Sequence, residues 1–130
     1  MLSDIYLKNF TIVTQLHLTL NRGLSVLSGE TGAGKSIVID AVKVCLGARS
    51  DYTLIRHGEK QCVISLSFDL KHIPAAQKWL ETHDFSSDNE CIIARTLQSD
   101  NRSRSSINGR PCSSNLVREL ATQLIVIHGQ

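Results

Sequence analysis

One octapeptide in this chain combines residue types that bind phosphate. Residues 29–36 read GETGAGKS and match the pattern G-x-x-x-x-G-K-[S/T] at every fixed position. Glycines let backbone N–H groups turn toward phosphate oxygens, a lysine ammonium can bind β- and γ-phosphates, and a serine hydroxyl can ligate Mg²⁺. The sequence therefore predicts a nucleoside triphosphate site, with Lys35 and Ser36 in direct contact, made of Gly29, Glu30, Thr31, Gly32, Ala33, Gly34, Lys35 and Ser36.

The segments on either side of this loop have the pattern that such a loop requires. Residues 24–27 are a short apolar run, typical of a buried strand, and residues 36–46 carry an apolar stripe at helical spacing that Gly47 ends. Strand, loop and helix in this order are the setting of a phosphate-binding loop, and the start of the helix adds the positive end of its dipole. The flanking segments therefore support the interpretation of residues 29–36 as a phosphate-binding loop.

Length and composition limit what surrounds the site. A chain of 130 residues with 42% hydrophobic and 20% charged residues is typical of one globular domain. No apolar run is long enough to span a membrane, and the N-terminus lacks a basic region followed by an apolar block, so we expect a cytoplasmic protein with no membrane partner. The formal charge of +2 is too small to indicate nucleic acid by itself. Widely spaced cysteines predict free thiols: Cys45, Cys62, Cys91 and Cys112.

The remaining sequence predicts an α/β fold with a mixed sheet. Alternating segments indicate half-exposed strands, and Asn108-Gly109 is a favoured hairpin dipeptide, so part of the sheet should be an antiparallel β-meander. Ser113 or Ser114 can cap a helix. The predicted strands are 5–10, 16–20, 62–70, 91–97, 103–107 and 124–127, and the predicted further helices are 74–83 and 115–121.

Two groups of arginines leave two interpretations open. Arg49 and Arg56 lie in a polar loop, residues 47–60, that we expect on the nucleotide side; they either reach phosphate or nucleic acid or are solvated surface arginines. A second group near the predicted hairpin either forms a basic face that binds DNA phosphates or is solvated: Arg95, Arg102, Arg104 and Arg110.

No segment supplies the acid that usually completes a Mg²⁺ site. Asp69 follows an apolar segment, but Ser65 and Ser67 give that segment a polar face, unlike a strand inside a parallel sheet. The apolar run 124–127 is followed by His128-Gly129-Gln130 instead of an acid. Because ligands bind at such strand ends, we expect His128 and Gln130 near the phosphates. We also expect the isolated chain to bind nucleotide without turnover.

Several motifs together resemble the RecN family of bacterial DNA-repair proteins, which are relatives of the SMC ATPases. The resemblance implies an ABC-type ATPase head that binds ATP and Mg²⁺. It also implies that Gln130 is similar to the Q-loop glutamine that senses Mg²⁺ and the attacking water, and that Arg56 resembles the arginine-loop residue of SMC heads. The segments that carry it are LKNFTIV at 7–13, GETGAGKS at 29–36, IVIDA at 37–41, LGAR at 46–49, IRHG at 55–58, ING at 107–109 and IHGQ at 127–130.

Heads of this family are built from both ends of a long chain with a coiled-coil arm between them. Residues 1–130 resemble the N-terminal lobe, so we expect a separate C-terminal lobe to carry the acidic strand, the signature motif and the switch histidine. The resemblance then implies a nucleoid-associated ATPase of double-strand break repair and recombination, in which ATP joins two heads and DNA is held. Its partners would be its own C-terminal lobe, a second head and DNA. The alternative is a nucleotide-dependent protein-binding module without turnover.

Overall fold

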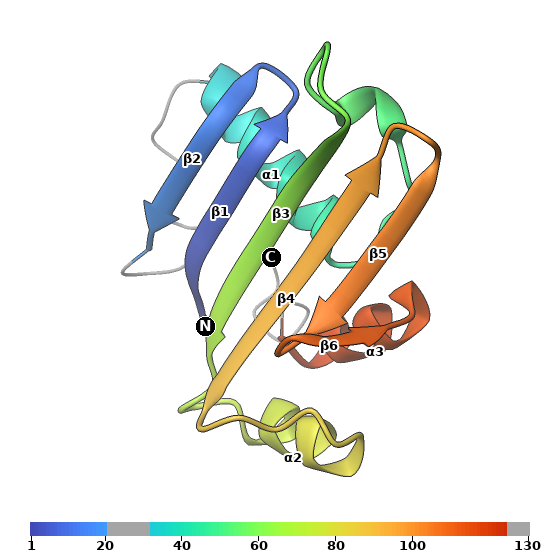
Figure 1. Cartoon of the computed structure of the whole chain (residues 1–130). Helices are drawn as coiled ribbons and strands as arrows, with labels where there is room; N and C mark the ends of the chain where they lie inside the picture. Colours follow the sequence, from blue (N-terminus) through green and yellow to red (C-terminus); the bar gives the residue numbers. More distant parts are fainter. Residues whose placement is uncertain (21–31, 125–130) are drawn as a thin grey trace.

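A single antiparallel sheet of six strands dominates the computed structural model, which describes residues 1–20 and 32–124 (Figure 1). The strands lie in the order β2-β1-β3-β4-β5-β6, and every neighbouring pair runs antiparallel. The strands are β1 Leu2–Phe10, β2 Val13–Thr19, β3 Gln61–Asp69, β4 Glu90–Gln98, β5 Arg102–Ile107 and β6 Arg110–Cys112. The helices are α1 Gly32–Cys45, the 3₁₀ turn η2 Tyr52–Leu54, α2 Pro74–Thr82 and α3 Ser114–Leu124.

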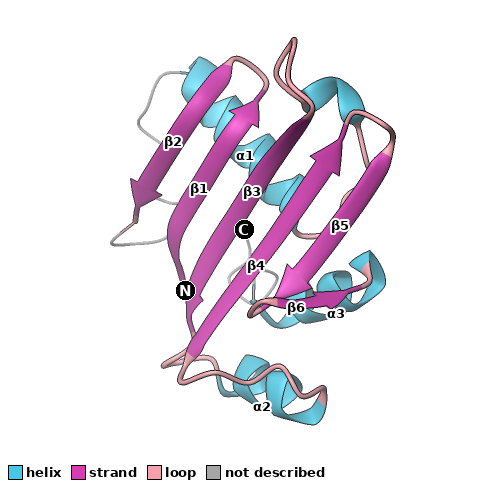
Figure 2. Ribbon diagram, viewed as in Figure 1, coloured by secondary structure: helices cyan, strands magenta, loops and turns pink. Residues whose placement is uncertain are grey.

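Helix α1 crosses one face of the sheet and forms the core with it (Figure 2). Side chains on this face alternate with polar ones along β3, as the period of a strand requires: Cys62, Ile64, Leu66 and Phe68 are buried. The matching stripe of α1 is Val38, Ala41, Val42 and Cys45. Each large aliphatic side chain buried here contributes about 1.5–3 kcal/mol. The helix that carries the predicted phosphate-binding residues is therefore held by the centre of the sheet.

The two glycine-dependent turns form as the sequence predicts. Asn108 and Gly109 both have positive φ, 49° and 81°, and Ile107 pairs with Arg110 across them, which is the geometry of a type I′ hairpin. Gly47 ends α1 with φ 108°, while the N–H of Ala48 donates to the carbonyl of Lys43 at 3.1 Å. That bond closes a Schellman motif at the C-terminus of the helix.

Helix α3 begins as expected but runs further than the sequence suggested. Of the two candidate caps, Ser113 is the one used: its hydroxyl accepts a hydrogen bond from the N–H of Leu116 at 3.2 Å. The prediction that a strand starts at Leu124 is wrong for that residue, which ends α3. Val117, Leu120 and Leu124 are all buried on one stripe of the helix, and this spacing carries the helix through Leu124.

The parallel part of the predicted mixed sheet lies outside the described residues, because both of its strands were expected in 24–27 and 124–127. Within residues 1–20 and 32–124 the sheet is antiparallel throughout, so the mixed sheet stays a prediction. In the same residues no helix has the length and apolar character needed to cross a membrane. All four cysteines are free thiols, and burial raises the pKa of each of them.

Candidate functional site

The first turn of α1 holds the described part of the predicted phosphate loop. Gly34, Lys35 and Ser36 lie within it; Lys35 is half-buried and Ser36 is exposed. The first turn contains no Asp or Glu, so the positive end of the helix dipole has no carboxylate of its own helix to neutralise it. A Cβ added at Gly34 would meet no atom of the described residues outside its own helix within 4 Å, which leaves open space among them. These features fit a phosphate group, and a hydroxyl such as that of Ser36 is a suitable ligand for Mg²⁺.

The other end of α1 is fastened to the sheet. The thiol of Cys45 donates weak hydrogen bonds to the carbonyls of Ile93 at 3.3 Å and Ile64 at 3.8 Å, which lie on β4 and β3. Arg118 of α3 donates to the carbonyl of Gly47 at 2.7 Å. The bond from Arg118 satisfies a carbonyl at the helix end that would otherwise lack a partner, and the thiol contacts join the helix to two strands. They also set the axis of α1, and with it the position of Lys35.

Arg56 lies in a loop that is bonded to the hairpin between β1 and β2. Its N–H donates to the carbonyl of Asn9 at 2.8 Å, and the N–H of Thr11 donates to the carbonyl of Leu54 at 2.7 Å. Ile55 between them is buried and bridges to Phe10. Sequence patterns predicted a surface loop here and did not reveal this attachment. Because the backbone is held on both sides of Ile55, Arg56 has a defined place.

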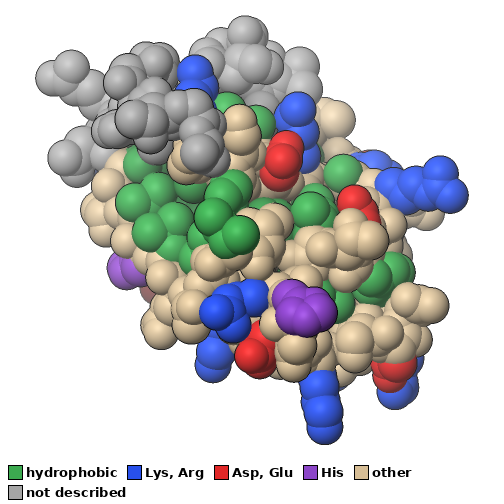
Figure 3. Space-filling model, turned by 90° about the horizontal axis from the view of Figure 1, so that it is seen from above, with side chains coloured by type: hydrophobic (Ala, Val, Ile, Leu, Met, Phe, Trp, Pro, Cys, Tyr) green, Lys and Arg blue, Asp and Glu red, His purple; other side chains and the backbone are tan. Residues whose placement is uncertain are grey.

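The structure brings Arg56 and the start of α1 to the same end of the sheet (Figure 1). Seen from above, this end shows a patch of hydrophobic side chains with positive and negative side chains interspersed around it (Figure 3). The guanidinium of Arg56 lies 3.8 Å from the carboxylate of Glu59, and both side chains are about 40% exposed. Such an exposed pair is weak, about 0–1 kcal/mol, so the arginine is available to a stronger anionic partner.

Other predicted site residues lie outside the described part of the chain. Gly29, Glu30 and Thr31 precede α1 there, and His128 and Gln130 follow α3 there. Gly32 and Ala33 begin α1. The proposed roles of these residues therefore stay predictions.

The position of Asp69 agrees with the expectation that it is not a second Mg²⁺ ligand. Asp69 ends β3, and that end of β3 lies at the opposite end of the sheet from the start of α1 (Figure 1). Its carboxylate is exposed and accepts a hydrogen bond from the N–H of Lys71 at 2.9 Å. Strand β3 pairs antiparallel on both sides, so it is not the interior strand of a parallel sheet.

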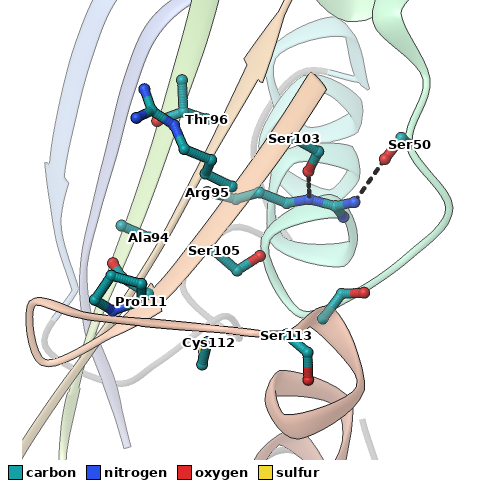
Figure 4. Close-up of a pocket in the computed structure, with 12 residues that line it drawn as sticks. Ser50, Ala94, Arg95, Thr96, Ser103, Ser105, Pro111, Cys112 and Ser113 are labelled. Atoms are coloured by element: carbon teal, nitrogen blue, oxygen red, sulfur yellow. Dashed lines mark hydrogen bonds between the residues drawn. The ribbon is translucent and has the colours of Figure 1, made fainter. Parts of the chain in front are cut away.

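Arg95 does not belong to a DNA-binding face, and that prediction is wrong. Its side chain is only 4% exposed and points toward α1 (Figure 4). It donates to the carbonyls of Val44 at 2.7 Å and Ala48 at 2.6 Å, and to the hydroxyls of Ser50 at 2.8 Å and Ser103 at 3.0 Å. A cation at the C-terminus of a helix interacts favourably with its dipole. Arg95 therefore stabilises the end of α1.

The signal for this role was present in the sequence. Ile93, Arg95 and Leu97 alternate with half-exposed residues along β4, so Arg95 shares the buried face. Of the other arginines proposed for DNA, Arg102 pairs with Asp100 at 2.5 Å, whereas Arg104 and Arg110 are exposed.

Comparison with sequence families gives one extended match. The family model described as the RecF/RecN/SMC N terminal domain matches residues 1–128. The chain is 41% identical to the DNA repair protein RecN of Vibrio cholerae over 130 residues and 39% identical to that of Halalkalibacterium halodurans over 132. Each alignment covers all of this chain but only 24% and 23% of the relative. The chain thus spans about a quarter of the length of these proteins.

Solved structures agree with this at the level of the fold. One, from work on ATP-driven dimerization and DNA-stimulated activation of SMC ATPases, superposes with a TM-score of 0.75 at 21% identity, covering 94% of this chain and 78% of that one. The recombination mediator protein RecF, solved with an ATP analogue, gives a TM-score of 0.63 at 17% identity, with 90% and 29% covered.

Proposed function

Because the chain belongs to the RecF/RecN/SMC N-terminal domain family, we propose that it is the nucleotide-binding N-terminal lobe of an SMC-like ATPase head that acts in DNA repair. The observation that carries the proposal is the first turn of α1, where Lys35 and Ser36 follow a glycine with open space beside it and no acid is present. The RecN relatives, which are named DNA repair proteins and align over this whole chain, support the same assignment.

The proposed ligands are ATP and Mg²⁺. Gly29 to Gly34 would surround the phosphates with backbone N–H groups, Lys35 would place its ammonium against the β- and γ-phosphates, and the hydroxyl of Ser36 would ligate Mg²⁺. Bound Mg²⁺ neutralises charge on the phosphates. Gln130, by its family resemblance, would orient the attacking water near the metal, and Arg56 would contact phosphate from the loop attached to the β1–β2 hairpin.

Hydrolysis is proposed for the intact protein only. The first turn of α1 contains no Asp or Glu, and the one acid-terminated candidate, Asp69, lies at the other end of the sheet. Phosphoryl transfer to water needs a positioned nucleophile and compensation of charge on the transferred group, and Lys35, Ser36 and Gln130 supply part of that set. We therefore propose that a C-terminal lobe completes the site, and that this chain alone binds without turnover.

The proposed partners are that C-terminal lobe, a second head bound through ATP, and DNA. The relatives are about four times as long as this chain, which leaves ample sequence for a second lobe and an arm. We propose that the intact protein is located in the cytoplasm, in association with the nucleoid. A binding module whose nucleotide controls protein association without turnover remains the second candidate; ATP hydrolysis by the two lobes together would exclude it.

Calorimetry with ATP and Mg²⁺ on the full-length protein tests the nucleotide site through Lys35→Ala. Loss of a charge-assisted contact worth about 1.5–3 kcal/mol should weaken binding by roughly 10- to 150-fold. Lys43→Ala is the matched control, because Lys43 is an exposed lysine in the last turn of the same helix. Equal affinity of the folded Lys35→Ala protein and the control would refute the assignment.

A further inference from the structure

A hollow of about 460 Å³ lies beside the free edge of β5, away from the nucleotide site (Figure 4). Strand β6 pairs with β5 only as far as Ser105, so the preceding part of β5 has no outer neighbour among the described strands. The loop after α1 and the first turn of α3 close the other sides. The lining residues that the argument uses are Ser50, Arg95, Ser103, Ser105 and Ser113.

The lining of this hollow is basic and rich in hydroxyl groups. Among the described residues it includes seven serine or threonine residues, the buried cation Arg95 and no Asp or Glu, while Arg104, opposite Thr96, points to the other face of the sheet. The buried guanidinium of Arg95 is bonded only to neutral carbonyls and hydroxyls. A buried charge without an ionic partner is costly unless something else compensates it. The negative end of the α1 dipole compensates part of the charge, and an anion in the hollow would compensate the rest.

Arg95 also fixes two hydroxyl groups as hydrogen-bond acceptors toward it. Its guanidinium can only donate, so the hydroxyls of Ser50 and Ser103 must accept from it, and each keeps its own proton for another acceptor. The hydroxyl of Ser113 is in the same state, because it accepts from the N–H of Leu116. None of these three hydroxyls donates a hydrogen bond to a residue that the structure describes.

Ser105 and the start of α3 add further donors. Ser105 lines the hollow, is 8% exposed, and has no hydrogen-bond partner for its hydroxyl within residues 1–20 and 32–124. Helix α3 has 11 residues and no acid in its first turn, and Ser113 and Ser114 at its start line the same hollow. Its first N–H groups and positive dipole end therefore add to the donors on the strand side.

We propose that this hollow binds a phosphate group. A site with surplus donors, one buried cation and no carboxylate among the described residues needs a ligand that brings acceptors and negative charge. Water brings as many donors as acceptors and no charge, whereas a phosphate brings at least two acceptor oxygens with negative charge. The group comes from a nucleic-acid backbone or from a free phosphate anion, which share this chemistry.

This site is distinct from the nucleotide site. Arg95 contacts the C-terminal end of α1, whereas Lys35 lies in its first turn, and a 14-residue helix is about 20 Å long. The proposal does not depend on ATP binding, so either site can fail in experiment without the other.

Alkylation of Cys112 tests the proposal, because this half-buried thiol lines the hollow while Cys45, Cys62 and Cys91 are buried. Full-length protein is treated with iodoacetamide at increasing inorganic phosphate, and the rate at Cys112 is measured by mass spectrometry of its peptide. Phosphate should slow the reaction at least fivefold. Ser105→Ala and Ser103→Ala should need at least about tenfold more phosphate for the same effect. Arg102→Gln is the matched control, since Arg102 lies on the same strand but pairs with Asp100.

Further arms separate the sources of phosphate and exclude an indirect effect. Protection should persist in Lys35→Ala. If it disappears there but survives in Ser105→Ala and Ser103→Ala, the phosphate acts from the nucleotide site and the proposal fails. Duplex DNA in phosphate-free buffer should protect Cys112 if the group is a backbone phosphate, and protection by inorganic phosphate alone identifies a free anion. If neither probe slows alkylation, or Cys112 is inert without any probe, the proposal is overturned. Ser103 is exposed, so Ser103→Ala keeps the test valid if Ser105→Ala fails to fold.

Discussion

Replacing Arg95 with methionine should loosen α1 from the sheet. Methionine is long and flexible enough to occupy the same space but donates no hydrogen bond. The carbonyls of Val44 and Ala48 would lose their bonds at 2.7 and 2.6 Å, while the hydroxyls of Ser50 and Ser103 could turn to other partners. The carbonyl of Ala48 has no second partner among the described residues, so its loss carries most of the cost.

The magnitude follows from two opposing effects. Losing two hydrogen bonds to a charged donor costs about 3–6 kcal/mol. Removing the charge offsets part of this loss in free energy, because burying a charge away from water is unfavourable. Burial lowers the pKa of Arg95 from its ordinary value for the same reason. We expect a net loss of about 2–3 kcal/mol in the free energy of opening α1. Since 1.4 kcal/mol is a factor of ten, amide exchange should accelerate roughly 30- to 150-fold.

Hydrogen exchange by mass spectrometry on the full-length protein measures this locally, in peptides from the second half of α1 and from β4. Arg110→Met is the control: Arg110 is exposed, and its substitution should change exchange by less than a factor of about three, or 0.5 kcal/mol. Two results would refute the reasoning. Unchanged exchange in Arg95→Met would mean that these bonds contribute nothing net, and equal acceleration in Arg110→Met would mean that the effect does not come from the bonds of Arg95.

Three further predictions concern other contacts. Gly47→Ala should destabilise the protein by about 2–4 kcal/mol in urea unfolding, because φ is 108° and the new Cβ would lie 2.4 Å from the side chain of Arg118. Gly58→Ala is the control: φ is 85° but no described atom lies within 4 Å of the new Cβ, so it should cost only about 1–2 kcal/mol. Asn108→Gly should keep the turn but lose the bonds to Ile92 at 2.8 Å and Phe85 at 2.7 Å, lowering the urea midpoint by the equivalent of about 1–3 kcal/mol. At pH 8 the thiol of Cys112 should be alkylated at least about tenfold faster than that of Cys45, which is fully buried with its pKa raised by burial; equal rates would show that α1 opens readily.

Much of the fold could be predicted because its signals are local. Period-two alternation located β1 to β5 to within a few residues, Asn108-Gly109 produced the expected hairpin, and Gly47 ended α1 where only a residue tolerant of positive φ fits well. The short β6 was not predicted, because three residues carry no periodicity. The predicted helix ended at residue 121, whereas α3 continues to Leu124. An apolar run such as 124–127 suits a strand or a helix equally, and the packing of Leu124 on the buried stripe of α3 makes that residue helical.

By itself the sequence identified the family and predicted a nucleotide site and its chemistry. A phosphate loop is a contiguous motif, so Lys35 and Ser36 could be identified from spacing alone, and the family assignment follows from further motifs spread over the chain. Only the tertiary structure decided what depends on residues far apart in sequence. It turned Arg95 from a candidate DNA contact into a cap for α1, 47 residues away from Ala48, and it attached the Arg56 loop to the β1–β2 hairpin. It also gathered hydroxyls from three segments around one hollow, because side-chain direction and the closing of long loops are set by the packed sheet.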